Sequence, residues 1–332
     1  MSEKRKSDHI ELAFKSQIKI PSSDFIYEPL FARHPNEIDD ISVSFLGKKL
    51  SAPLWISSMT GGTEKALRLN KNLATVAGEF GFGMGLGSCR SLLESSSRLA
   101  DFDMKDQIGD NPFFINLGIA QLEGLIESKK VSQIKNLIEK LQADGLIIHI
   151  NPLQEWLQPE GDRYKKAPID TIKSILKEAS YPIVVKEVGQ GFGPKSLESL
   201  CRLPLAAVDL SGFGGTNFSL LELSRHNAQE LDRESSQYKL VEAGHTCDEM
   251  ITWLNSLLSK NEELSCSNFI VSGGIKNIVD GFKLQEKLNA PSLIGMASSF
   301  LKYAEDISML RDFVASEIEN YKLAKKVLRV KK

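Results

Sequence analysis

The sequence has few cysteines, and they lack the spacing of a structural zinc site or a disulfide framework. Its 332 residues include only four, Cys89, Cys201, Cys247 and Cys266, and no two of them form a CxxC pair. Scattered thiols of this kind are typical of reduced intracellular proteins. We therefore expect a cytoplasmic location and no metal held by thiolates.

Long apolar runs and an excess of one charge are also missing. No apolar stretch approaches the roughly 20 residues of a membrane helix, and the first residues are charged, unlike a signal peptide. The 41 Lys and Arg residues nearly balance the 43 Asp and Glu residues, and the net charge is −2. This balance gives no overall attraction to nucleic acid or to a membrane surface. We expect neither as a partner.

The sequence does contain a regular alternation of short apolar runs and amphipathic segments. The apolar runs are typical of buried strands and cover residues 53–59, 82–88, 113–118, 146–150, 183–188, 206–211, 269–273 and 293–297. Between most of them, apolar residues recur at three- and four-residue spacing, which predicts helices over residues 65–80, 132–141, 170–179, 247–258 and 278–288.

Eight such units without hairpin signals indicate parallel strands joined by crossovers. The simplest closure is a (β/α)₈ TIM barrel over residues 51–332, with residues 1–50 as an N-terminal extension that packs on the barrel mouth. The long polar segment 225–238, between the sixth and seventh runs, is predicted to be an insertion or a mobile lid. An open doubly wound sheet is the alternative, but the turn Met59-Thr-Gly-Gly-Thr-Glu64 lacks the dinucleotide-binding G-x-G-x-x-G pattern.

The most informative motif lies at the end of the fourth apolar run, where His149, Asn151, Gln154 and Glu155 occur together. Period-two alternation places His149 and Asn151 on the same side of the strand end, and we expect Gln154 and Glu155 on the loop that follows. Polar groups at the end of an apolar element cost stability unless they are paired. This group therefore indicates a site for a polar substrate and a hard cation, with Glu155 as the metal ligand.

Glycine-rich turns after the seventh and eighth runs predict a phosphate site. They are Ser272-Gly-Gly274-Ile-Lys276 and Gly295-Met296-Ala297-Ser298, at the usual place for phosphate binding in a barrel. The Ser211–Thr216 turn could add a hydroxyl group to the same phosphate. Lys186, at the end of a buried strand, is a costly charge unless it meets an anion or a reduced ring. A planar cofactor that carries a phosphate would satisfy these groups, and FMN fits best.

A second anion site is predicted near the N-terminus. Arg5, Lys6 and His9 place two cations and an imidazole within five positions, and Arg90 follows the second strand. If the N-terminal segment folds over the barrel mouth, these cations could clamp a diphosphate.

Together these residues resemble the type 2 isopentenyl diphosphate isomerases, FMN-dependent enzymes that interconvert isopentenyl and dimethylallyl diphosphate. The resemblance covers nearly the whole chain. The motifs that carry it are His149-x-Asn151-x-x-Gln154-Glu155, Ser58-Met59-Thr60-Gly61-Gly62, Lys186-Glu187-x-Gly189 and Ser211-Gly-x-Gly-Gly215-Thr216-Asn217. The chain departs from the family at Cys89, where Gln is usual, and at Lys276, where Arg is usual; Lys keeps the charge but not the bidentate fork.

The resemblance implies a role for each matching position. The predicted FMN contacts are Met59, Thr60, Gly61, Ser88, Asn116, Lys186, Ser211, Thr216, Gly274, Lys276, Met296 and Ala297. The predicted substrate-binding residues are Arg5, Lys6, His9, Arg90 and Gln154, and the predicted catalytic residues are Gln154, His149 and Asn151. Glu155 would hold Mg²⁺ on the diphosphate. The resemblance also implies a homotetramer or homo-octamer that uses NADPH only to reduce the flavin.

The residues do not decide which group protonates the alkene, and they allow two other functions. No side chain is an obvious acid for an alkene carbon, so either the reduced flavin N5 or Gln154 would deliver the first proton. One alternative is an FMN-dependent oxidoreductase of a small hydroxy acid on the same barrel. Such an enzyme would need a His base and an Arg late in the barrel, whereas His149 comes on the fourth strand. The other alternative is a flavin- or diphosphate-binding protein without activity, against which the Gln154-Glu155 pair argues.

Overall fold

The predicted (β/α)₈ barrel is confirmed. The computed structural model describes residues 2–18, 24–36, 38–58, 63–226, 231–260 and 263–331. Eight parallel strands close in the order β10-β11-β4-β5-β6-β7-β8-β9. They are β4 (Leu54–Ile56), β5 (Gly83–Gly85), β6 (Phe113–Gly118), β7 (Gly145–Ile150), β8 (Ile183–Glu187), β9 (Ala207–Asp209), β10 (Phe269–Ser272) and β11 (Ser292–Met296). Each overlaps one of the eight predicted runs, and β7 and β11 begin one residue before theirs.

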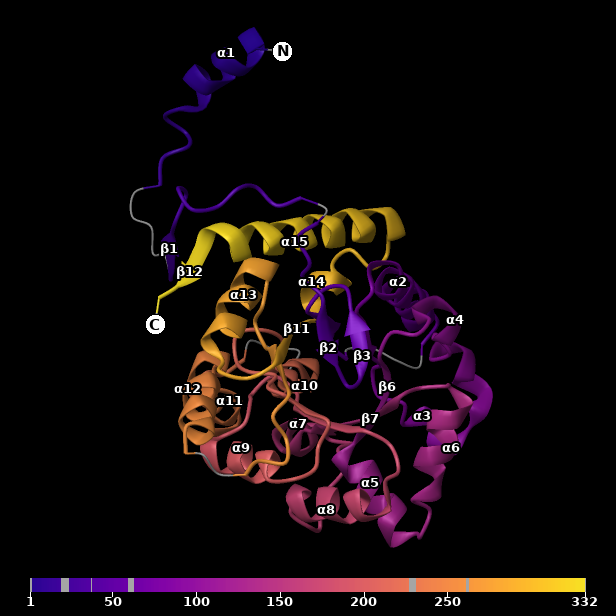
Figure 1. The fold of residues 1–332 in the computed structure, drawn as a ribbon. Helices are drawn as coiled ribbons and strands as arrows, with labels where there is room; N and C mark the ends of the chain where they lie inside the picture. Colours follow the sequence, from indigo (N-terminus) through magenta and orange to yellow (C-terminus); the bar gives the residue numbers. More distant parts are fainter. Residues whose placement is uncertain are drawn as a thin grey trace.

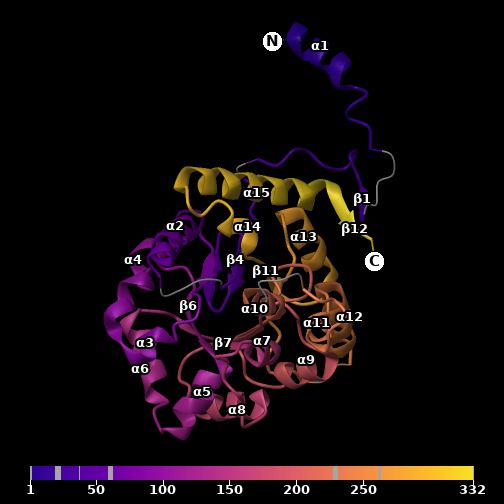
Figure 2. The same cartoon turned by 180° about the vertical axis from the view of Figure 1, so that it is seen from behind.

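Helices surround the barrel (Figures 1 and 2). The longer ones are α2 (Glu64–Phe80), α5 (Ile119–Glu127), α6 (Ser132–Lys140), α8 (Pro168–Glu178), α9 (Pro194–Cys201), α12 (Cys247–Leu258), α13 (Ile278–Lys287) and α15 (Ile307–Val327). All five predicted helices are among them. The shorter ones are α3 (Ser91–Glu94), the 3₁₀ helix η1 (Ser96–Asp101), α4 (Lys105–Ile108), α7 (Pro152–Leu157) and α14 (Ser298–Leu301). In the described part of the chain, no helix has the length and apolarity to cross a membrane.

Side chains alternate between the two faces of each barrel strand. In β7, Leu146, Ile148 and Ile150 belong to the core between the strands and the surrounding helices. Ile147 belongs instead to the apolar cluster inside the barrel. Because successive side chains of a strand point to opposite faces, this alternation fixes which residues face the barrel axis along the whole strand.

A hairpin closes the amino-terminal end of the barrel. Its strands, β2 (Val43–Phe45) and β3 (Lys48–Leu50), pair antiparallel. Phe45 and Leu50 pack into the interior cluster, and the Phe45 ring centroid lies 5.9 Å from that of Trp55 near the start of the barrel. Lys48 Nζ pairs with the Asp144 carboxylate, just before β7, at 2.6 Å. We expected the N-terminal extension to pack on the barrel mouth. This part of it lies instead at the opposite end of the barrel.

The rest of the N-terminal extension is held against the C-terminus. Strand β1 (Phe25–Tyr27) pairs antiparallel with β12 (Leu328–Val330), beside the end of α15. Helix α1 (Ser2–Leu12) extends away from the barrel in both views (Figures 1 and 2). The single chain therefore does not bring the predicted N-terminal cations to the mouth.

The insertion predicted between the sixth and seventh strands carries two helices. Helix α10 (Phe218–His226) begins soon after β9, and α11 (Ser236–Val241) follows it, while residues 227–230 lie outside the described residues. Leu223 of α10 and Val241 of α11 pack with Leu157 of α7 in a small separate core. The insertion therefore covers the helix that carries Gln154 and Glu155.

Candidate active site

On most barrel strands, the interior side chains change from apolar to polar within two residues. The interior cluster includes Trp55, Phe114, Ile147, Val184, Ala207, Ile270 and Leu293. Two residues later on the same strands come Ser57, Asn116, His149, Lys186, Asp209, Ser272 and Gly295. Strand alternation makes these residues face the same interior, one layer nearer the carboxyl ends. These side chains, several of them predicted from the sequence, therefore form a single layer across the barrel mouth.

His149 is held as a neutral ring with a defined tautomer. Asn116 Nδ2 donates to the Leu86 carbonyl oxygen at 3.0 Å, so Asn116 Oδ1 faces His149 Nδ1 at 2.7 Å and accepts its hydrogen. Burial, and then the positive charge of Lys186, lower the pKa of His149 to about 3. The ring is therefore uncharged at neutral pH, and its Nε2 is an acceptor.

We expect His149 not to titrate between about pH 5 and pH 8, where an ordinary histidine gains its charge. The chain has five histidines, so ¹³Cε1-labelled histidine would give five NMR signals, and the one lost in His149→Gln belongs to His149. Its chemical shift should stay constant across this range. An inflection of the His149 signal in this range would contradict a neutral ring held by Asn116.

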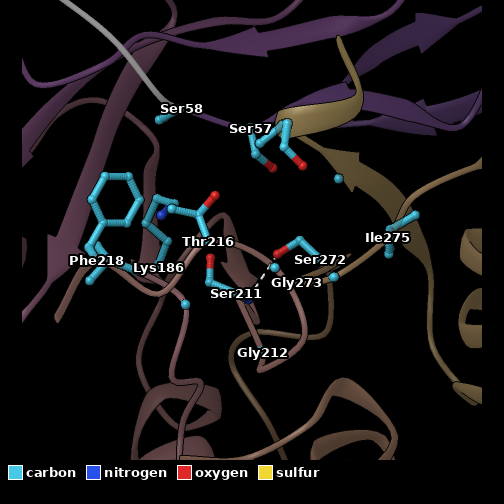
Figure 3. A pocket seen from close by; sticks show the side chains of 17 residues that line it. Ser57, Ser58, Lys186, Ser211, Gly212, Thr216, Phe218, Ser272, Gly273 and Ile275 are labelled. Carbon is cyan, nitrogen blue, oxygen red and sulfur yellow. Dashed lines mark hydrogen bonds between the residues drawn. The ribbon is translucent and has the colours of Figure 1, made fainter. Parts of the chain in front are cut away.

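A cavity with about 550 Å³ of empty space lies over the polar layer (Figure 3). Loops that follow β4, β8, β9, β10 and β11 line it, and Lys186, Ser211, Thr216 and Ser272 are among its side chains. The hydroxyl groups of Ser57 and Ser58 are buried and have no hydrogen-bond partner among the described residues. Because an unpaired buried hydroxyl costs stability, these two groups indicate a polar ligand in this cavity.

Glycines allow the loops after β9 and β10 to touch. Gly273 has φ +104°, and a Cβ there would lie 2.1 Å from the Gly212 carbonyl oxygen. Gly274 has φ +73°, and a Cβ there would lie 2.7 Å from the Gly214 carbonyl carbon. We predicted these glycines as a way for a phosphate to approach the backbone. The structure shows that they are also required for close contact between the two loops.

Asp209 is a buried carboxylate in the polar layer that we did not predict. Its Oδ1 accepts hydrogen bonds from Ser211 Oγ at 3.2 Å and from Ser272 Oγ, and it pairs in register with Lys186 on β8. Burial raises the pKa of Asp209 and lowers that of Lys186, while each group favours the charged form of the other. The inward period-two position of Asp209 was the signal in the sequence that could have revealed it.

A hydrogen-bonded cluster lies at the end of β7, on a helix and not on the predicted loop. Pro152 begins α7, and Asn151 occupies the N-cap position. Asn151 Nδ2 donates to Gln154 Oε1 and to Glu155 Oε1, both at 3.1 Å. Glu155 is buried, and its Oε2 accepts from the Asp162 backbone N–H at 2.7 Å. Three of the predicted residues therefore form one rigid unit.

Asp162 adds a second acidic side chain near Glu155. Asp162 Oδ2 accepts from Arg90 Nη1 at 2.9 Å and from Gln121 Nε2 at 3.0 Å. It thereby brings the predicted substrate residue Arg90 to the β7 cluster. Partners 72 residues apart cannot be inferred from local spacing, so this ion pair could not be predicted from the sequence.

The other predicted residues are placed as follows. Lys186, Ser211, Thr216, Gly274 and Ala297 line the cavity. The Met296 side chain faces outward into the core beneath the helices, so only its backbone can border the mouth. Ser88 and Lys276 are exposed, as are Arg5, Lys6 and His9 on α1. Met59, Thr60 and Gly61 lie outside the described residues.

The chain is similar in sequence to two curated bacterial enzymes, and no family model matches it. It is 35% identical over 330 residues to the isopentenyl-diphosphate delta-isomerase of Rickettsia felis, covering 96% of this chain and 90% of that one. It is 36% identical over 325 residues to the enzyme of the same name from Rickettsia akari, covering 95% and 89%.

Solved structures with a similar fold share much less sequence. A flavocytochrome b2 variant with pyruvate bound has a TM-score of 0.59 and 16% identity, covering 90% of this chain and 72% of that one. A lactate oxidase from Pediococcus acidilactici has a TM-score of 0.54 and 13% identity, covering 93% and 83%. A mandelate oxidase variant with an FMN adduct has a TM-score of 0.52 and 11% identity, covering 90% and 88%. These likenesses concern the barrel fold.

Proposed function

The chain belongs to the isopentenyl-diphosphate delta-isomerase family, and on this premise we propose that it interconverts isopentenyl and dimethylallyl diphosphate with reduced FMN, Mg²⁺ and NADPH. The observation that carries the proposal is the polar layer at the mouth, from Asn116 and His149 through Lys186 to Asp209 and Ser272. It lies between a cavity suited to a cofactor phosphate and the Gln154-Glu155 pair. We further propose a cytoplasmic homotetramer or homo-octamer that recruits NADPH only to reduce the flavin.

The cavity residues suit FMN. The unpaired hydroxyls of Ser57 and Ser58 and the hydroxyl of Thr216 can donate to a phosphate or a ring carbonyl, whereas the Ser211 hydroxyl already donates to Asp209. Lys186, which is only 6% exposed, would place its charge beside an electron-rich ring. Bound reduced FMN would supply that ring and a nitrogen that exchanges a proton near the alkene.

The β7 cluster suits Mg²⁺ on a diphosphate. In the described part of the chain, no three His, Cys, Asp or Glu side chains are placed to hold a metal by themselves. Mg²⁺ commonly takes one or two protein carboxylates and completes its shell with phosphate oxygens and water. Glu155 would supply the carboxylate, and Arg90, held by Asp162, would add a positive charge for the diphosphate.

The side chains of this cluster act mainly by orienting the substrate, and less by changing their own charge. Neutral His149 accepts through Nε2, and Gln154, whose Oε1 is engaged by Asn151, has its amino group left to donate. In this proposal Gln154 orients the alkene end of the substrate and relays a proton on the face away from the flavin.

A second candidate is an FMN-dependent oxidoreductase of a small hydroxy acid, which the likeness to lactate and mandelate oxidases favours. Its base would have to remove a proton from the hydroxy acid. The described histidine of the polar layer, His149, is on the fourth barrel strand and is held by Asn116, whereas the oxidase chemistry called for one late in the barrel. The two candidates differ in redox balance: the isomerase reaction has no net redox change, whereas oxidation of each hydroxy acid passes two electrons to the flavin and consumes one equivalent of an oxidant.

We expect purified protein to release FMN, and not FAD, on heating. The cavity is lined by one set of glycine-rich turns predicted to bind a phosphate, and the sequence suggests no adenosine pocket. The visible spectrum should show flavin bands that bleach on reduction, and isomerase activity should follow FMN content when the protein is stripped and reloaded. Release of FAD, or absence of any chromophore after soaking with FMN, would contradict the proposed cofactor.

A further inference from the structure

The loop that follows α7 is fastened to the neighbouring helix α5. The backbone N–H groups of Lys165 and Lys166 donate to the buried Glu123 carboxylate at 3.1 Å and 2.8 Å, and Lys165 Nζ pairs with Glu127 at 2.8 Å. The loop also packs closely on α7, because a Cβ at Gly161 would lie 2.0 Å from the Glu155 carbonyl oxygen. Tyr164 is therefore presented to the β7 cluster from a fixed support.

The hydrogen-bond directions in the cluster lead back to Tyr164. A carboxylate accepts and cannot donate, so Asn151 must present its Nδ2 to Glu155 Oε1, as observed at 3.1 Å. The Asn151 Oδ1 then faces the other way, where the Tyr164 hydroxyl donates to it at 2.8 Å. The same Nδ2 donates to Gln154 Oε1. One hydroxyl thus completes the orientation of both side chains that Asn151 holds.

We infer that Tyr164 is a positioning residue of this site: its hydroxyl fixes the Asn151 amide, which in turn holds the Gln154 amide and the Glu155 carboxylate. The effect of Tyr164 on the reaction rests on the proposed function. The hydrogen-bonded geometry around Tyr164 does not depend on that function. Burial, and then the charge of Glu155, raise the pKa of Tyr164, so the hydroxyl keeps the hydrogen that it donates. Without that hydrogen bond, Asn151 can rotate and release both partners.

The test compares Tyr164→Phe with Tyr321→Phe. Both changes delete one hydroxyl that donates to an amide oxygen, and Tyr321 lies on α15, where it bonds Gln285 Oε1 at 2.7 Å. Three quantities are measured for each: the FMN content, kcat and KM of the isomerase reaction, and the binding of Mn²⁺ by electron paramagnetic resonance. The Mn²⁺ titration uses oxidised enzyme with isopentenyl diphosphate.

Tyr164→Phe should keep its FMN but lose about 10-fold in kcat and about 10-fold in Mn²⁺ affinity, the usual range for loss of a group that orients a metal ligand. Tyr321→Phe should match the wild type in kcat and in Mn²⁺ affinity. Its melting temperature should fall by about as much as that of Tyr164→Phe. Equal kcat and equal Mn²⁺ binding in the two variants would overturn the inference. If the wild type itself shows no isomerase activity, the proposed function fails, and the Mn²⁺ comparison still tests the role of Tyr164.

A second variant covers the case in which Tyr164→Phe does not fold. Glu123→Gln weakens the anchor of the loop without touching the β7 cluster, because an amide offers one acceptor oxygen where the carboxylate offers two. It should weaken Mn²⁺ binding in the same direction, by a smaller factor. Unchanged Mn²⁺ binding in Glu123→Gln would count against the fixed presentation of Tyr164.

Discussion

Replacing Glu155 with glutamine is expected to remove the Mg²⁺ response and to lower turnover about 100-fold, while FMN content stays at the wild-type level. Glu155 is buried, and its two oxygens accept from Asn151 Nδ2 and from the Asp162 backbone N–H. An amide is a much poorer ligand for a hard cation than a carboxylate. The flavin cavity is lined by other strands, so its occupancy should not change.

The same substitution has a predictable cost in stability. Glu155 now accepts hydrogen bonds from two N–H donors. In glutamine, the side-chain NH₂ would face one of these donors, and this donor–donor contact lowers the free energy of unfolding by about 1–3 kcal/mol. Glu160→Gln is the matched control, because Glu160 is exposed on the loop that follows α7 and pairs with Arg225 at 3.4 Å. Steady-state rates across a Mg²⁺ titration would compare the two. Near-normal turnover and an unchanged Mg²⁺ response in Glu155→Gln would place the metal elsewhere.

Gln154→Asn is the second change with a large expected effect. The side chain becomes one methylene shorter, so it cannot keep its bond to Asn151 Nδ2, now 3.1 Å, and still reach the substrate. A misplacement of about 1 Å in an active site can lower turnover about 100-fold. We expect kcat to fall by that order with FMN retained.

Gln158→Asn, one helical turn later on the chain, is the control for Gln154→Asn. Its side chain takes part in none of the hydrogen bonds of the β7 cluster, so kcat should remain near the wild-type value. The flavin spectrum and the melting temperature would show whether both variants are folded. If Gln154→Asn keeps wild-type kcat, Gln154 neither relays a proton nor orients the alkene.

Strands and the facing of their side chains could be predicted from the sequence because period-two alternation is a local property. His149 and Asn151 were placed on one side of their strand from spacing alone, and Lys186 was recognised as a costly buried charge. The same rule applied to residues 206–211 would have shown Asp209 facing the mouth. The short helix α7 also had a local signal, since proline at the first helical position is common and Pro152 occupies it.

Contacts between distant segments could not be predicted in this way. Phe45 closes the barrel against Trp55 through strands of only three residues, too short to show periodicity. Arg90 meets Asp162, and Tyr164 meets Asn151, because the barrel brings their loops to the same end. The helices of the insertion were expected as a loop, since their polar composition hides the small core around Leu223.

The most direct test of the account is the number of products formed for each reduction of the flavin. Enzyme with bound FMN is photoreduced once without oxygen, and excess isopentenyl diphosphate is added with Mg²⁺ in deuterium oxide. The account predicts many equivalents of dimethylallyl diphosphate per flavin, with solvent deuterium in the product and the flavin still reduced at the end. One product for each equivalent of reductant, or equal activity of the oxidised enzyme, would contradict it.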